Sequence, residues 1–122
     1  MTQRARRTWL AVVVTGVALA VARPAFVAAK APSEGELLSK IEKGGTANDH
    51  AALASFYRDQ AKAAAQKATD HEAMAVRFAP AMKTDWATHC RSLASYYRKL
   101  SEEYEAMAKL HEGHAAELRK KE

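Results

Sequence analysis

Residues 46–79 and 81–112 contain neither glycine nor proline, and Pro80 stands alone between them. The first stretch consists largely of Ala, Gln, Lys and Met, which lose little conformational freedom in a helix. Proline lacks the backbone N–H that a helix interior needs, so Pro80 marks a break. We therefore expect an all-α fold with two long helices, over about 47–77 and 85–119.

Large side chains recur along the second long segment at alternating steps of four and three residues, the spacing of a coiled-coil interface. This predicted seam consists of Trp86, Cys90, Leu93, Tyr97, Leu100, Tyr104, Met107, His111, His114 and Leu118. The first segment offers a row of mostly small residues, namely Leu53, Ala54, Tyr57, Ala61, Ala64, Ala68, His71 and Ala75. If the chain folds back at Pro80, facing residue numbers add to about 161, and large residues meet small ones. The sequence therefore predicts a long antiparallel two-helix hairpin with coiled-coil-like packing.

An internal repeat supports the hairpin. LASFYR at 53–58 recurs as LASYYR at 93–98, and the His-Glu pair at 71–72 recurs at 111–112, both at a shift of 40 residues. Stacked repeat proteins generally need three or more copies. We therefore interpret the two copies as the two arms of one hairpin, with the first units of a repeat array as the alternative.

A shorter helix is predicted within residues 30–46. Ser33 and Glu36 have the spacing of a capping box, and the neighbouring Gly44 and Gly45 end the helix. Its apolar side chains, Leu37, Leu38 and Ile41, fall on one side. The hairpin helices follow in the segment 47–122.

Phe56 and Tyr96 occupy equivalent positions in the two repeats, just outside the predicted seam. Both aromatic rings would be partly exposed on an isolated hairpin, whose two helices bury only a thin core. We expect the short helix to cover one of them, or a second copy of the chain to cover both. The second case would give a homodimeric four-helix bundle.

Residues 1–29 have the parts of an export signal. Basic residues at 4–7 precede an uncharged, largely apolar run at 8–22, and the small residues at 27–29 suit cleavage before Lys30. This run is shorter than the ~20 residues of a membrane-spanning helix, so an uncleaved membrane anchor is the alternative. The paired arginines also resemble a twin-arginine signal, which leaves the export route open. The signal predicts the periplasm or the cell envelope as the location.

The net charge of +5 comes from 19 Lys and Arg against 14 Asp and Glu. Four of the basic residues and none of the acidic ones lie in 1–29, so the remainder of the chain is close to neutral. A basic surface for nucleic acid is therefore not expected. Export also means that Cys90, the only cysteine, must stay buried, bind a ligand or pair with another chain.

Two sets of metal-ligating residue types come together in the predicted hairpin. One is His71, Cys90 and His89 near the turn, and the other is His50, His111 and His114 at the open end. On one helix, His50 and His71 are ~30 Å apart, so the two sets form two separate sites. Imidazole and thiolate ligands suit Zn²⁺ or copper. A metal-binding or thiol redox role therefore follows as one hypothesis.

Packing gives the competing interpretation of the same residues. Histidines in a helix interface are often hydrogen-bonded core residues, and a single buried cysteine packs as a small apolar side chain. Each set also offers two firm ligands, whereas a structural zinc site uses four. An intermolecular disulfide through Cys90 is a third alternative. On the packing interpretation the protein holds no cofactor.

Enzyme signatures are absent from the sequence. It contains no glycine-rich phosphate loop, no HExxH, no CxxC and no serine at a strand-to-helix elbow. We therefore expect a protein that is not an enzyme.

The segments DHAALASFYR, HEAMA, HCRSLASYYR and YEAMAKLHE resemble small exported bacterial proteins of unknown function, in which an Ala-rich helical hairpin follows a signal peptide. The resemblance covers residues 48–115 and implies fold and compartment, without implying an activity. Together with the signal and the hairpin, it favours a structural or protein-interaction module of the cell envelope. The expected partner is a second copy of the chain or another envelope protein.

Overall fold

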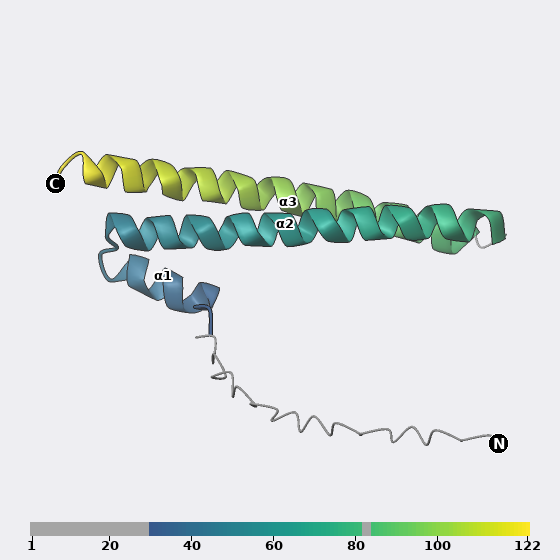
Figure 1. Ribbon diagram of the computed structural model, residues 1–122, viewed down its shortest axis with the longest axis horizontal. Helices are drawn as coiled ribbons and strands as arrows, with labels where there is room; N and C mark the ends of the chain where they lie inside the picture. The colour runs from purple at the N-terminus through teal and green to yellow at the C-terminus, as the bar shows by residue number, and fades with distance from the viewer. Residues whose placement is uncertain (1–29, 82–83) are drawn as a thin grey trace, which may run out of the picture. The chain divides into compact units, whose positions relative to one another are not determined.

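The computed structural model describes residues 30–81 and 84–122. The predicted export signal at 1–29 lies outside the described residues. All regular elements of the described part are helical: α1 (Glu34–Glu42), α2 (Ala47–Phe78), the short 3-10 helix η1 (Ala79–Ala81) and α3 (Thr84–Arg119). Helices α2 and α3 lie side by side and run in opposite directions (Figure 1). The predicted all-α hairpin is thus confirmed, and no helix in the described residues is apolar and long enough to cross a membrane.

Capping side chains set where the first two helices begin. Ser33 accepts a hydrogen bond from the backbone N–H of Glu36, whose carboxylate accepts from the Ser33 N–H, as the capping box predicted. Thr46 and Asp49 form the same arrangement at the start of α2. These side chains satisfy backbone donors that have no partner within the helix.

The two glycines between α1 and α2 allow a tight connection. Gly44 has a φ of +95°, a conformation that residues with a Cβ rarely adopt. A Cβ on Gly45 would lie 2.8 Å from the Ile41 Cδ1 and 2.9 Å from the Ile41 Cα. The linker therefore passes close over the end of α1, and the same Cβ position is 3.6 Å from the His50 Nε2.

Alanines occupy every seventh position at the contact between the long helices. On α2 they are Ala47, Ala54, Ala61, Ala68 and Ala75, all buried. On α3 the corresponding small residues are Ala87, Ala94, Ser101, Ala108 and Ala115. Small side chains let two helix backbones approach closely. The Ser101 hydroxyl accordingly reaches the opposite backbone and donates a hydrogen bond of 2.9 Å to the Ala61 carbonyl.

The predicted seam of α3 was wrong at every second position. The structure buries Ala87 rather than Trp86 and Ala108 rather than Met107, whose exposed fractions are 57% and 36%. At these positions the prediction was displaced by one residue, because large side chains were taken to mark the contact with α2. The contact is made instead by the small residue that follows each of these large residues. Cys90 is buried as predicted.

The predicted register is confirmed at three points along the hairpin. His50 contacts His111, and the rings of Tyr57 and Tyr104 stack with centroids 6.0 Å apart. The bond between Ser101 and Ala61 lies at the corresponding level farther toward the turn. The residue numbers of these facing pairs add up close to the predicted sum. The error in the seam concerned which side of α3 faces α2, and it left the position of α3 along α2 almost unchanged.

Helix α1 covers one end of the hairpin. Leu37 of α1 is buried with Leu53, Tyr57 and Ala108, and Phe56 packs against the edge of this cluster. Its repeat equivalent Tyr96 is 59% exposed. The short helix therefore covers one of the two equivalent aromatic side chains, which is one of the two predicted arrangements.

Candidate functional site

The three histidines predicted at the open end, where α2 begins and α3 ends, lie together. The Nδ1 atoms of His50 and His111 are 3.0 Å apart, so one carries the proton and the other accepts it. Their ring centroids are 5.2 Å apart, and the ring of His114 stacks on His50 at 5.4 Å. The register of the hairpin brings the beginning of α2 beside the last third of α3, which places these rings in one cluster.

The cluster favours the neutral imidazole of His111. Burial lowers the pKa of His111 from its ordinary value of 6.5, and the charges that His50 and His114 acquire on protonation lower it further. Two protonated rings at this separation would repel one another in a partly dry environment. The contact between His111 and His50 is therefore favoured when His111 is neutral, which is also the form of imidazole that coordinates metal ions.

The second predicted set, His71, Cys90 and His89, is divided. The ring of His71 stacks on Tyr97, with centroids 5.6 Å apart and 7° between the ring planes. Cys90 is a free, buried thiol with an exposed fraction of 8%. His89 is exposed and lines a shallow apolar cavity of about 340 Å³ together with Cys90 and Trp86. His89 thus shares a surface with Cys90, while His71 makes its ring contact away from the turn.

Side-chain length keeps His71 and Cys90 apart although they occupy facing positions. The thiol of Cys90 is short, whereas the imidazole of His50 at the equivalent position reaches His111. The Nδ1 of His71 is buried and, among the described residues, has no hydrogen-bond partner.

Metal ligation needs several converging donors, and the described residues provide few. Within 30–81 and 84–122, no group of three or more His, Cys, Asp or Glu side chains could hold a metal ion as arranged. At the open end, two predicted ligand atoms, the Nδ1 atoms of His50 and His111, lie 3.0 Å apart. Two nitrogens bound to one tetrahedral Zn²⁺ would be about 3.3 Å apart, so this pair has a suitable spacing.

The two repeats engage each other through reciprocal ring contacts. Tyr57 of the first repeat stacks on His111 of the second, with centroids 5.9 Å apart and 21° between the planes. Tyr97 of the second repeat stacks on His71 of the first. Because Tyr57 corresponds to Tyr97 and His71 to His111, the hairpin has a pseudo-two-fold relationship at this level.

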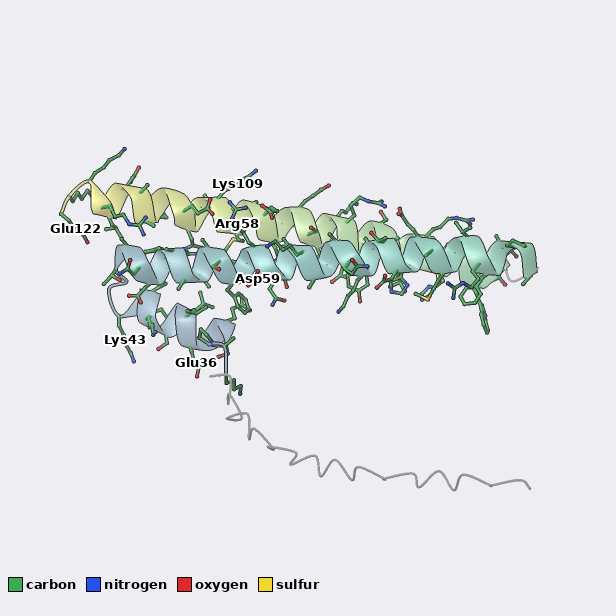
Figure 2. The ribbon with its side chains drawn as sticks, in the orientation of Figure 1. Glu36, Lys43, Arg58, Asp59, Lys109 and Glu122 are labelled. Carbon is green, nitrogen blue, oxygen red and sulfur yellow. The ribbon has the colours of Figure 1, made fainter. Side chains whose placement is uncertain are left out.

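Ion pairs follow the same reciprocity. Arg58 donates two hydrogen bonds of 2.7 Å to Glu112, and it donates a third, of 2.9 Å, to Glu105. Arg98 pairs with Glu72 in the equivalent place. Figure 2 labels Arg58 where α2 runs beside α3. These ion pairs line one flank of the hairpin. The hydrogen bond from Arg58 to Glu112 is the main cause of the raised pKa of Arg58.

The repeat was recognisable in the sequence, and this reciprocity was not predicted from it. The signal was available, because each Tyr-Arg pair precedes a His-Glu pair by fourteen residues, or two coiled-coil heptads. In an antiparallel hairpin with this register, such a spacing brings the Tyr-Arg pair of each repeat against the His-Glu pair of the other repeat. The shift of 40 residues also places Cys90 at the position of His50. A short thiol instead of an imidazole accounts for the unpartnered Nδ1 of His71.

Tyr57 connects the hairpin to α1. Its hydroxyl donates a hydrogen bond of 2.8 Å to the Glu34 carboxylate in the first turn of α1. Burial, followed by this hydrogen bond and the negative charge of Glu34, raises the pKa of Tyr57 to about 12. The tether holds the first turn of α1 on the hairpin while Leu37 packs beside it.

A second apolar row runs along α3, next to its contact with α2. We call it the outer row; it follows alternating steps of three and four residues and contains Trp86, His89, Leu93, Tyr96, Leu100, Glu103, Met107, Leu110 and His114. Tyr96 is 59% exposed and Leu110 62% exposed. Among the described elements, α2 and η1 are those whose backbone lies close to α3. The described helices therefore leave much of the outer row to solvent.

A scan against protein-family models finds no match to the chain, and searches of the curated proteins and of the solved structures find none either.

Proposed function

We propose that the protein is an exported, non-enzymatic helical module of the bacterial cell envelope that binds other proteins through the outer row of α3. The observation that carries the proposal is the exposure of this row beside a closed contact between α2 and α3. Exposed apolar side chains at coiled-coil spacing are suited to receive another helix. Export is the part of the proposal that rests on the sequence alone, through the signal pattern at 1–29.

Site-specific photocrosslinking in cells tests the interaction. A photoreactive phenylalanine analogue replaces Tyr96 in the outer row, and in a matched control it replaces Val76, which is 72% exposed on α2. We expect defined crosslinked species from position 96 and none from position 76. Equal crosslinking at both positions, or none at position 96, would contradict the proposal. Fractionation of the same cells tests the location, because the crosslinked protein should be found with the envelope.

A second candidate function is binding of Zn²⁺ or copper at the open end. The specific observation in its favour is the 3.0 Å separation of the His50 and His111 Nδ1 atoms. Both atoms could coordinate one ion if the proton on one Nδ1 moved to the Nε2 of the same ring. His114 stacks on His50 and could supply a third imidazole after a side-chain rotation. In the Irving–Williams order, Cu²⁺ would bind this site more tightly than Zn²⁺.

Calorimetric titration of the full-length chain with Cu²⁺ and Zn²⁺ separates the candidates. We expect one site per chain, lost in His111→Gln and retained in His89→Gln, which alters an exposed histidine at the turn. A parallel titration of His71→Ala and Cys90→Ser tests the other predicted set, including a thiol-dependent response. Binding no tighter than about micromolar in every variant would reject the metal function.

A further inference from the structure

The outer rows of α2 and α3 are related by the repeat, and they differ in a consistent way. On α2, the row is apolar at Leu53 and Phe56, where α1 lies on it. Farther along, it carries the polar residues Gln60, Lys67 and Asp70 together with Ala63 and Met74. Its adjacent large apolar residues, Leu53 and Phe56, thus coincide with the part that another helix covers.

On α3, the outer row has large apolar residues at three positions where α2 has polar ones, while Glu103 stands where α2 has Ala63. Leu100, Met107 and Leu110 stand at the repeat positions of Gln60, Lys67 and Asp70. The exposed fractions of Met107 and Leu110 are 36% and 62%. The contact with α2 does not account for apolar side chains at the exposed positions Met107 and Leu110, whereas a helix packed over them would.

The covering helix must be long. The row extends over 86–114, which is about 42 Å along the axis, whereas a nine-residue helix such as α1 spans about 14 Å. A second copy of the chain offers two helices of sufficient length, α2 and α3. Beyond α1, the outer row of α2 is interrupted by Gln60, Lys67 and Asp70, so α3 provides the more apolar surface.

We infer that the partner of the outer row is a second copy of this chain, and this inference rests on the proposed interaction through that row. The two α3 helices pair antiparallel, and the two-fold axis passes beside Leu100. In this register Leu93 faces the Met107 position of the other copy, and Leu100 faces its own counterpart. Tyr96 faces Glu103, so a phenolic hydroxyl can donate to the only carboxylate of the row at each of two symmetric places.

Neighbouring registers are less favourable. Sliding the copies by one heptad in one direction places the two Glu103 carboxylates against each other, which costs free energy through repulsion and desolvation. Sliding them in the other direction leaves Leu110 beyond the apolar row of the other copy. Parallel pairing also brings Glu103 against Glu103. The antiparallel register at Leu100 uses the whole row and separates the carboxylates, and it yields a four-helix bundle.

Disulfide trapping in the full-length chain tests the register. In a Cys90→Ser background, Leu100→Cys places one thiol on the two-fold axis, within the Cα separation that a disulfide spans. We expect rapid, near-complete formation of a covalent dimer upon mild oxidation. Val76→Cys in the same background is the matched control and should remain monomeric on gels. Covalent dimers from Val76→Cys alone would overturn the inference.

Sedimentation measurements provide a second test that does not use thiols. The unmodified chain should form a dimer, and Leu110→Lys should weaken dimerisation by about tenfold or more while leaving the helical circular dichroism signal unchanged. Leu110 is suitable because it is 62% exposed, so the hairpin does not need it for folding. A chain that stays monomeric at about 100 μM, far above the Kd of ordinary specific complexes, overturns the inference.

The outcomes separate this inference from the proposed function. A monomeric chain that still photocrosslinks a different envelope protein from position 96 overturns the self-pairing and supports the interaction module. A chain that crosslinks neither to itself nor to another protein through the outer row overturns both.

Discussion

The ring of His71 lies parallel to the ring of Tyr97, with 5.6 Å between their centroids and 7° between their planes. The same contact joins His111 to Tyr57 at the equivalent place in the other repeat. The two places differ in one residue, because His50 partners the Nδ1 of His111 whereas Cys90 leaves the Nδ1 of His71 without a partner. This difference makes the pseudo-two-fold relationship testable by substitution.

Cys90→His should complete the second histidine pair. The new imidazole occupies the position equivalent to His50 and can hydrogen-bond the buried Nδ1 of His71, which is costly to leave unpaired. We expect a thermal unfolding temperature at or above that of Cys90→Ala, the matched variant that leaves a cavity. Unfolding followed by circular dichroism at pH 7.5 measures the difference. A Cys90→His chain clearly less stable than Cys90→Ala would show that the two places are not equivalent.

The stability of the hairpin should fall at mildly acidic pH. The folded state lowers the pKa of His111 below 6.5, so it favours the neutral ring. The unfolded chain therefore takes up protons first, and the stabilisation present above about pH 6.5 is lost as the pH falls through that value toward the folded-state pKa. Urea unfolding at a series of pH values between 8 and 5 measures this loss.

His111→Gln is the control for that titration. Glutamine retains a hydrogen-bonding group near His50 but does not titrate, so the dependence of stability on pH should become shallower between about pH 7 and 5. An unchanged slope would mean that other groups cause the acid sensitivity.

Tyr57→Phe should loosen α1. The substitution removes the hydroxyl that donates to Glu34 while keeping the ring that packs with Leu37. We expect a loss of about 1 kcal/mol in the free energy of unfolding, the usual net value of one such bond. Hydrogen exchange should accelerate in α1 and remain unchanged in the half of the hairpin near the turn. Tyr104→Phe, in the neighbouring ring, provides the control.

The raised pKa of Tyr57 also predicts a decline in stability at alkaline pH. The folded state favours the neutral phenol up to about pH 12, while the unfolded chain ionises near its ordinary value of 10.0. Stability contributed by this group is therefore lost as the pH rises above about 10. Tyr57→Phe should reduce this alkaline loss, and an unaltered profile would contradict the assignment.

Ala68→Leu should strongly destabilise the hairpin. Ala68 is 4% exposed at a position where small residues of both helices let the backbones approach. Three additional carbon atoms there would force the helices apart, at a cost of about 1–3 kcal/mol. Ala73→Leu on the exposed side of α2 is the matched control and should have little effect. Chemical unfolding of both variants measures the costs, and equal values would contradict the close packing.

The ion pair between Arg58 and Glu112 should contribute less to the stability of the hairpin than the close packing at Ala68 does. Arg58 and Glu112 are both partly exposed, so solvent and salt screen their attraction despite the paired hydrogen bonds. Glu112→Gln should destabilise the chain less than Ala68→Leu does, and the effect should shrink in 1 M NaCl. Salt-dependent urea unfolding measures this change, for which Glu102→Gln on the exposed surface of α3 is a control. A loss that salt does not reduce would assign Glu112 a role other than charge pairing.

The sequence by itself determined which segments are helical, how the hairpin is paired and which histidines meet at the open end. Helix propensity, capping spacing and the position of Pro80 are local properties, so they can be recognised without coordinates. The antiparallel register followed from the repeat and from the need to match large residues with small ones. For the same reason, His50, His111 and His114 could be grouped correctly.

Only the tertiary structure decided which side of α3 faces α2. A pattern of large residues fits two helix faces about equally when small residues occupy the true interface, and the choice depends on how closely the backbones approach. That approach buries Ala87 and Ala108 and turns Met107 and Leu110 outward. The tertiary structure also stacks the ring of His71 on Tyr97, seven residues along α3 from the facing Cys90.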